Sequence, residues 1–127
     1  MRPSVESDQA WKDLFPVHEG FVRSDSGSIS AFSVFHQLHC LNTLRQVTYE
    51  LLDAANDTHL AQRDDEHSHH HARYHAMHCF DYLRQGIQCS ADDALEEGIP
   101  ELGGVSGWGT IHRCRDFDAL KRNLQSN

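Results

Sequence analysis

Residues 36–46 read HQLHCLNTLRQ, and residues 75–85 read HAMHCFDYLRQ. Six of the eleven positions are identical in the two stretches, including two histidines and a cysteine. The shared pattern is His-x-x-His-Cys-x-[Asn/Asp]-x-Leu-Arg-Gln, and we interpret it as an internal duplication. The repeat therefore predicts two matched elements, each of which presents the same polar groups.

Both copies of the repeat are predicted to be helical. No proline or glycine occurs from about residue 31 to residue 55, where apolar residues recur at helical spacing. A second helix is expected at about 73–89, in which Phe80 and Ile87 flank the inward stripe. Counting at about 100° per residue gives one stripe per helix: His36, Cys40, Leu44, Val47 and Leu51 in the first, and His75, Cys79, Leu83 and Gly86 in the second. We expect these stripes to face inward. Antiparallel packing would let the motifs face each other, but the sequence does not fix the orientation.

The remaining segments predict a mainly α fold with irregular loops, short extended pieces and a short C-terminal helix. We expect residues 1–10 to be a flexible segment and residues 11–127 to form a single domain. The local expectations are a helical turn over 11–15, an N-cap at Ser30 or Ser33, a polar connector over 56–71, a glycine-rich loop over 98–109 anchored by Trp108, an extended piece over 111–114, and a final helix capped by Asp116 that carries Phe117, Leu120 and Leu124.

Composition excludes some classes of function. The net charge of −8 in 127 residues argues against a nucleic-acid partner, because such binders concentrate Lys and Arg on one face. No apolar run is long enough to cross a bilayer, so any membrane anchor would belong to a segment absent from this sequence. The sequon Asn56-Asp57-Thr58 and the even number of cysteines favour the lumen of the secretory pathway.

The histidines predict a metal site. Histidines three residues apart are neighbours on a helix, so both imidazoles of one motif can reach one metal or two adjacent metals. An isolated pair is more often an ordinary surface or core pair, but its duplication favours the ligand interpretation. The predicted ligands are His36, His39, His75 and His78. Imidazoles suit copper best, with zinc and non-haem iron as alternatives, and Asp81 is the motif acid that iron would need.

The four cysteines, Cys40, Cys79, Cys89 and Cys114, admit two interpretations. As thiolates, the motif cysteines would each join two histidines in a metal site. As disulfides, they would tie the helices together, and this is our preferred interpretation. We favour the pairs 40–79 and 89–114, although three pairings remain open. His112 is a further candidate ligand or general base, while the 67–71 histidine run is expected to be solvated. The two motif arginines are expected to brace Asn42, Asp81 or the loop.

At family level the sequence resembles the UstYa-like family of fungal secondary-metabolite tailoring proteins. The resemblance rests on the doubled His-x-x-His-Cys pattern and runs on through Gly86-Ile87-Gln88-Cys89. It also includes WKDLFP at 11–16, GFV at 20–22, DDALE at 92–96 and WGTIHRCRD at 108–116, and so covers nearly the whole chain. It implies oxidative tailoring of peptides or other natural products, by proteins that often carry an N-terminal membrane helix and act in homo- or hetero-dimeric pairs.

The sequence thus leads to a hypothesis with two alternatives. The hypothesis is a copper-dependent oxidase or oxygenase that acts on a small molecule or peptide, with His36, His39, His75, His78 and His112 as its catalytic residues. The first alternative is a redox-independent cyclase or isomerase in which motif histidines act as acid and base. The second is a non-catalytic metal-binding partner subunit.

Overall fold

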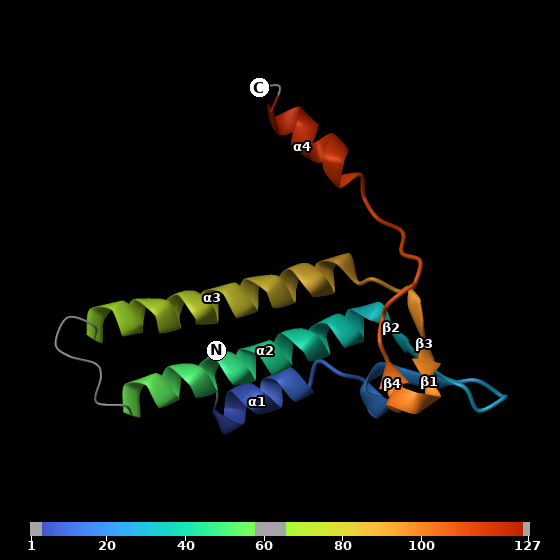
Figure 1. Cartoon of the computed structure of the whole chain (residues 1–127), viewed down its shortest axis with the longest axis horizontal. Helices are drawn as coiled ribbons and strands as arrows, with labels where there is room; N and C mark the ends of the chain where they lie inside the picture. Colours follow the sequence, from blue (N-terminus) through green and yellow to red (C-terminus); the bar gives the residue numbers. More distant parts are fainter. Residues whose placement is uncertain (1–3, 58–65, 126–127) are drawn as a thin grey trace.

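The computed structural model describes residues 4–57 and 66–125, and it is mainly α, as expected (Figure 1). The elements in chain order are helix α1 (Val5–Lys12), 3-10 helix η1 (Val17–Gly20), strands β1 (Phe21–Arg23) and β2 (Ile29–Phe32), helices α2 (Ser33–Asp57) and α3 (Glu66–Ser90), strand β3 (Leu95–Ile99), 3-10 helix η2 (Pro100–Leu102), strand β4 (Gly104–Val105) and helix α4 (Phe117–Gln125). The two predicted central helices are therefore present as α2 and α3, and each carries one copy of the repeat.

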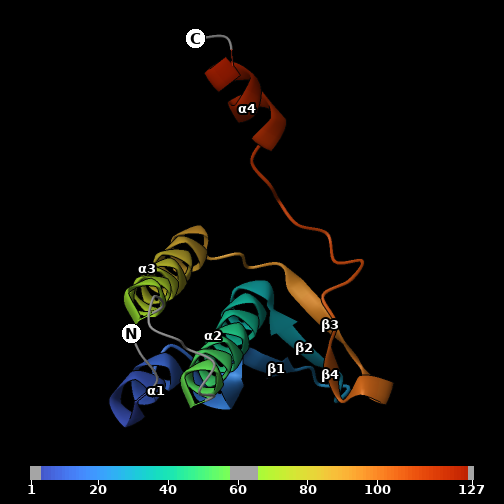
Figure 2. The same cartoon turned by 60° about the vertical axis from the view of Figure 1, so that its left-hand side comes forward.

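Helices α2 and α3 form an antiparallel hairpin (Figures 1 and 2). Three side-chain contacts fix its register: Gln37 with Asp92, Tyr49 with Phe80, and Arg73 with Asp53. This register places the first motif opposite the end of α3 and the second motif opposite about residue 51. The His-x-x-His-Cys segments of the two motifs, residues 36–40 and 75–79, are therefore about thirteen residues apart along the hairpin, roughly 20 Å at 1.5 Å per residue. The like motifs do not face each other.

The buried face of α2 is not the stripe that helical counting selected. Leu38, Leu41, Arg45 and Tyr49 are buried, whereas Cys40 is exposed and Leu44, Val47 and Leu51 are 60%, 46% and 66% exposed. On α3, His75 and Gly86 are exposed and Leu83 is 51% exposed. The prediction of inward-facing motifs was therefore wrong, although His36 is half-buried. Both faces of α2 carry apolar residues, so their spacing could not distinguish them.

The buried Arg45 explains which face α2 turns inward. Its guanidinium is fully buried and lies 5.2 Å from the centre of the Trp11 ring. It donates to Asp8 Oδ1 at 2.5 Å and, through Nε, to Asn42 Oδ1 at 3.0 Å. A buried cation requires such partners, because an unpaired charge in the interior is strongly destabilising. Arg45 therefore holds α1 against α2.

Residues 4–10, for which a flexible segment was expected, belong to the capped helix α1, while their flexibility stays a prediction. Ser4 and Ser7 form a reciprocal capping box, and Ser7 and Trp11 are buried. The sequence alone could not indicate this packing, because Asp8 and Trp11 contact Arg45, which lies 37 and 34 residues further along the chain. A long-range interaction therefore holds this segment against α2.

A four-stranded antiparallel sheet lies beside the start of α2, with the strand order β1-β2-β3-β4 (Figure 2). Strand β2 runs directly into α2, and Glu96 of β3 pairs with Ala31 of β2. The expected irregular loop over 98–109 was thus partly wrong, since β3 and β4 occupy its first part. Gly98 permits the close approach of β3 to β2, because a Cβ at this position would lie 2.4 Å from the carbonyl oxygen of Ile29.

The C-terminal segment extends away from the hairpin and ends in α4 (Figures 1 and 2). The predicted cap is confirmed, since Asp116 Oδ1 accepts from the Ala119 N–H at 2.7 Å. The apolar residues of α4, Phe117, Leu120 and Leu124, are 73%, 59% and 73% exposed. Trp108 is 91% exposed and does not anchor the loop, and residues 111–114 form no strand.

The predicted connector over 56–71 lies partly outside the described residues. Residues 58–65 lie outside the described residues, while the 67–71 histidine run belongs to α3 and not to a connector. Within the described ranges, none of the helices combines the length and the apolar character that a membrane crossing requires.

The buried guanidinium gives a stability prediction. Arg45→Lys keeps the charge but loses the planar fork that binds Asp8 and Asn42 together, so we expect a loss of about 1–3 kcal/mol in the free energy of unfolding. Arg84→Lys is the matched control, because Arg84 occupies the same place in the second motif but retains 26% side-chain exposure. We expect it to cost less than about 1 kcal/mol. Urea denaturation measures both, and equal losses would contradict this account.

Candidate active site

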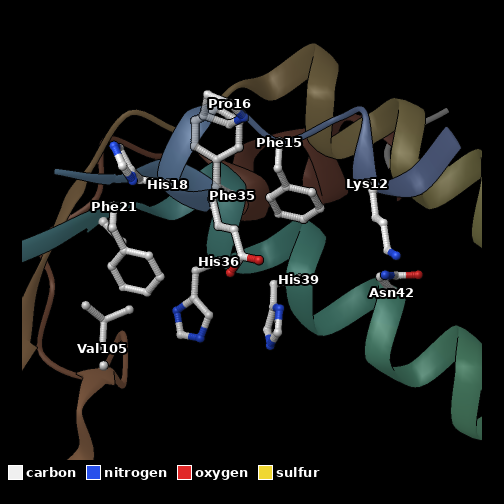
Figure 3. Close-up of a pocket in the computed structure, with 13 residues that line it drawn as sticks. Lys12, Phe15, Pro16, His18, Phe21, Phe35, His36, His39, Asn42 and Val105 are labelled. Atoms are coloured by element: carbon white, nitrogen blue, oxygen red, sulfur yellow. The ribbon is translucent and has the colours of Figure 1, made fainter. Parts of the chain in front are cut away.

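A pocket that contains two motif histidines lies where α2, η1 and the sheet meet. It is an open pocket of about 580 Å³, and Figure 3 shows His36 and His39 on one side of α2. Its lining residues are Lys12, Phe15, Pro16, His18, Glu19, Phe21, Ala31, Phe35, His36, His39, Asn42, Gly104 and Val105. The first motif thus supplies two imidazoles to a pocket that is also lined by three phenylalanines.

His36 is held from behind by a buried carboxylate. Its Nδ1 lies 2.6 Å from Glu96 Oε1, and the Glu96 side chain is only 4% exposed. The second carboxylate oxygen accepts from the Ser33 hydroxyl at 2.7 Å. Both oxygens of Glu96 are therefore engaged, and Nε2 is the nitrogen of His36 that remains for other partners. The sequence did not indicate this pair, which joins residues 60 positions apart.

The segment around Glu96 also caps α2. The backbone N–H groups of Ser33 and Val34 donate to the carbonyl oxygens of Ala94 and Asp92, both at 2.9 Å. These are two of the helix-terminal donors that otherwise need a side-chain cap. Ser33, one of the two expected caps, is instead the first residue of α2, and its hydroxyl binds Glu96. The segment from Asp92 to Glu96 therefore both caps the N-terminus of α2 and positions His36.

His39 lies one turn further along α2 and is more exposed than His36. Its carbonyl accepts from the Thr43 hydroxyl at 3.0 Å, but within the described part of the chain its imidazole makes no hydrogen bond. The two imidazoles differ accordingly: His36 is fixed and His39 is free to reorient. Together they form a two-imidazole half-site on the pocket wall.

The second motif does not join this half-site. His75 and His78 are exposed on α3, in a row of rings that runs from His71 to Tyr82 with centroid separations of 6.1, 6.4 and 6.1 Å. Among residues 4–57 and 66–125, no three His, Cys, Asp or Glu side chains gather closely enough to hold a metal. The helix register is the cause, because it separates the motifs along the hairpin. Metal binding by the four histidines remains a prediction.

The cysteines are not paired in this structure. Cys40, Cys89 and Cys114 are exposed, Cys79 is half-buried, and all four are free thiols. The predicted pairs 40–79 and 89–114 are therefore not formed. The same register that separates the histidines separates Cys40 from Cys79, which lie in corresponding positions of the two motifs.

His112 lies in a second carboxylate–imidazole pair. Its Nδ1 is 2.6 Å from Asp92 Oδ2, an oxygen that also accepts from the Gln37 side chain. The pKa of Asp92 is lowered, first because the Ala94 backbone N–H donates to it and further because of His112. His112 does not line the pocket of His36, so the sequence-based grouping of His112 with the motif histidines finds no support in this arrangement.

The arginine of each motif makes the same bond within its own helix. Arg45 Nε donates to Asn42 Oδ1 and Arg84 Nε donates to Asp81 Oδ1, both at 3.0 Å. The expectation that these arginines brace Asn42 and Asp81 is confirmed. The bond to Arg84 is also the chief reason why the pKa of Asp81 is lowered. The two copies of the repeat thus share this arginine hydrogen bond as well as their histidines.

Sequence reasoning missed two residues at the pocket rim. His18 and Glu19 both line the pocket and both adopt left-handed backbone angles, with φ of 64° and 56°. Two consecutive non-glycine residues in this region are uncommon and strained. The neighbouring Gly20 packs so closely on Phe35 that a Cβ would lie 2.5 Å from its ring. The only sequence signal was the Pro16 and Gly20 boundaries of the turn.

The structure is that of a small, mainly α protein. Beside its helical hairpin lies a pocket with two imidazoles, one of which is hydrogen-bonded to a buried carboxylate. The profile of a family described as mycotoxin biosynthesis protein UstYa matches residues 16–126. The chain therefore belongs to the UstYa family, as the resemblance implied.

Several curated proteins resemble this chain. Oxidase ustYa of Aspergillus flavus is 40% identical over 96% of this chain and 60% of its own length. UstYa family oxidase phomYb of Diaporthe leptostromiformis is 31% identical over 93% of this chain and 49% of its own length. Hydroxylase cctR of Talaromyces islandicus is 29% identical over 94% of this chain and 40% of its own length. The chain thus spans roughly half the length of these relatives. No solved structure matches it significantly.

The lowered pKa of Asp92 predicts an acid-sensitive contribution to stability. Because the folded pKa lies below the unfolded value of about 3.9, the ionised carboxylate stabilises the fold above pH 4 and loses this effect as the pH falls through the folded pKa. We expect Asp92→Asn to reduce the free energy of unfolding by about 1 kcal/mol at pH 6. The difference from the unmodified protein should shrink towards pH 3. Urea denaturation across this range tests the prediction, and a difference that does not depend on pH would contradict it.

Proposed function

We propose that this chain forms the catalytic region of an oxidoreductase that tailors a peptide or another fungal natural product, with copper bound at its His-x-x-His pairs. The observation that carries the proposal is the presence of His36 and His39 on the wall of the aromatic pocket. The names of the relatives, oxidases and a hydroxylase, support oxidative chemistry. Zinc and iron are the alternative metals.

The donor chemistry of the pocket fits copper. Imidazole nitrogens are good copper ligands, and the carboxylate on Nδ1 of His36 leaves Nε2 as its ligand atom. Iron sites usually include a carboxylate ligand; Glu96 is already used by His36 and Ser33, so iron would need Glu19, the carboxylate that lines the pocket. Copper held by His36 and His39 would supply one-electron oxidation of a phenol or a C–H bond.

The other lining residues suit an organic substrate. Phe15, Phe21 and Phe35 offer apolar surface that can pack on an aromatic or aliphatic group and exclude water. Lys12 lies at the same pocket and can pair with a substrate carboxylate. The volume of about 580 Å³ suits a small molecule or a peptide side chain.

The two imidazoles are only half of a four-histidine site, so we propose that a second chain completes it. His75 and His78 cannot reach His36 within one hairpin because of the register described above. They are exposed, as are Leu44, Val47 and Leu83 on the same two helices. A second copy or a related chain can therefore bring the two pairs together while covering this apolar surface.

We also propose a location in the lumen of the secretory pathway. The sequon begins at Asn56, near the end of α2 and at the opposite end of that helix from the pocket. A glycan there would leave the pocket open. The free thiols add no support, so the sequon alone carries this proposal.

A second candidate function needs no redox step. The two carboxylate–imidazole pairs, His36 with Glu96 and His112 with Asp92, have the arrangement of a general base with its orienting acid. A cyclase or isomerase built on them would turn over without oxygen and in the presence of a chelator. Anaerobic assay with chelator separates this function from the copper oxidase.

Copper binding is the first test. We expect the purified protein to bind copper, and His36→Ala and His39→Ala to weaken binding at least tenfold, because each removes one imidazole of the half-site. Gln46→Ala is the matched control and should leave copper binding unchanged, since Gln46 is exposed on the same helix and does not line the pocket. Elemental analysis and electron paramagnetic resonance provide the measurement. A folded protein that binds no copper, iron or zinc would remove the proposal.

Mixing of variants tests completion by a second chain. His36→Ala and His75→Ala proteins should each lose copper binding, and an equimolar mixture should regain part of it, because one intact interface can form in a mixed dimer. Sedimentation with and without copper should show a dimer for the unmodified protein. A monomer that binds copper fully, with no recovery on mixing, would contradict completion in trans.

A further inference from the structure

We infer that Glu96 is the positioning residue of this site, because it holds His36 in the tautomer that presents Nε2 to the pocket. The orientation of His36 stands on geometry alone, whereas its use as a metal ligand rests on the proposed function. Glu96 does not line the pocket, so it acts through His36 and not on a substrate.

The hydrogen bonds around Glu96 fix the position of one proton. The Ser33 hydroxyl donates to Oε2 and leaves Oε1 as the acceptor for His36. A carboxylate has no proton to donate, so the imidazole must carry its hydrogen on Nδ1. The lone pair of the neutral ring is then on Nε2, the nitrogen that a metal or an acidic substrate proton would meet.

The carboxylate is held rigidly in place. Glu96 is 3% exposed, and its backbone pairs with Ala31 in the centre of the sheet. Gly107, with φ of 78°, lies close to both Glu96 and His36. A Cβ at Gly107 would be 2.8 Å from Glu96 Oε1 and 3.6 Å from His36 Nδ1. The loop after β4 thus leaves room for the carboxylate and for no side chain beside it.

The arrangement distinguishes His36 from His39. An unconstrained imidazole can exchange its proton between the two nitrogens, and the hydrogen bond of one nitrogen decides which is free. His39 makes no side-chain hydrogen bond within the described residues, so its tautomer is not fixed. His36 is therefore the preorganised ligand, and His39 adapts to what is bound.

Nuclear magnetic resonance of metal-free protein labelled with ¹⁵N in histidine tests the tautomer directly. At pH 8, the signals of His36, identified by their absence from His36→Asn, should show a protonated Nδ1 and an unprotonated Nε2. Glu96→Ala should lose this preference, while Glu97→Gln should keep it. Glu97 is the matched control, because it is the exposed neighbour on the same strand. A protonated Nε2 in the unmodified protein would overturn the inference.

Copper(II) affinity, measured by competition with a chromogenic chelator, tests the consequence. We expect a loss of ten- to one-hundredfold in Glu96→Ala, because second partners of ligating histidines contribute on this scale. Glu96→Gln keeps the shape and an acceptor oxygen and should lose less, which guards against misfolding of the Ala variant. Thermal melts check both folds.

The two proposals fail in different ways. Unchanged copper affinity in well-folded Glu96→Ala would overturn the positioning role. A protein with the Nδ1–H tautomer that binds no copper would overturn the copper proposal, while it would support the orientation of His36 by Glu96.

Discussion

The buried guanidinium of Arg45 is the constraint on which the rest of the structure depends. A cation without access to water must be surrounded by groups that replace its hydration, and here α1 supplies Asp8 and Trp11. Once α1 is held in this position, the chain turns at Pro16 and forms the wall of the pocket. The same constraint turns Leu38 and Leu41 inward. It thereby leaves His36 and His39 facing the pocket and not the hairpin interface.

Local signals predicted much of the fold, because they depend on neighbouring residues. The repeat, the absence of proline and the Asp116 cap identified α2, α3 and α4, and the motif arginines were correctly expected to brace Asn42 and Asp81. Helix ends shifted by a few residues at α2 and by more at α3, where the histidine run continues the helix.

Long-range interactions set the features that the sequence could not predict. The position of α1 depends on Arg45, which follows it by more than 30 residues, and the sheet depends on glycine-containing strands that lack a clear alternating pattern. The buried face of α2 could not be inferred, because apolar residues lie on both of its sides. Glu96 could not be recognised for the same kind of reason: its partners Ser33 and His36 are about 60 residues away.

The candidate site shows how a duplication can produce two unlike halves. His36 and His39 lie in a pocket with a buried carboxylate behind them, whereas His75 and His78 lie on an open helix surface. The difference comes from their neighbours, because the sheet packs at the start of α2 and nothing equivalent packs on α3 among the described elements. The first copy therefore lines a pocket, whereas the histidines of the second are exposed to solvent.

The difference between Asn42 and Asp81 matches the charge around each arginine. The neutral amide of Asn42 suits Arg45, whose charge is already balanced by Asp8, whereas Asp81 supplies the only carboxylate that contacts Arg84 in the described part of the chain. An aspartate at position 42 would place two acids on one buried cation, and an asparagine at position 81 would leave its arginine unbalanced. Each copy of the repeat therefore carries the residue that suits the charge around its own arginine.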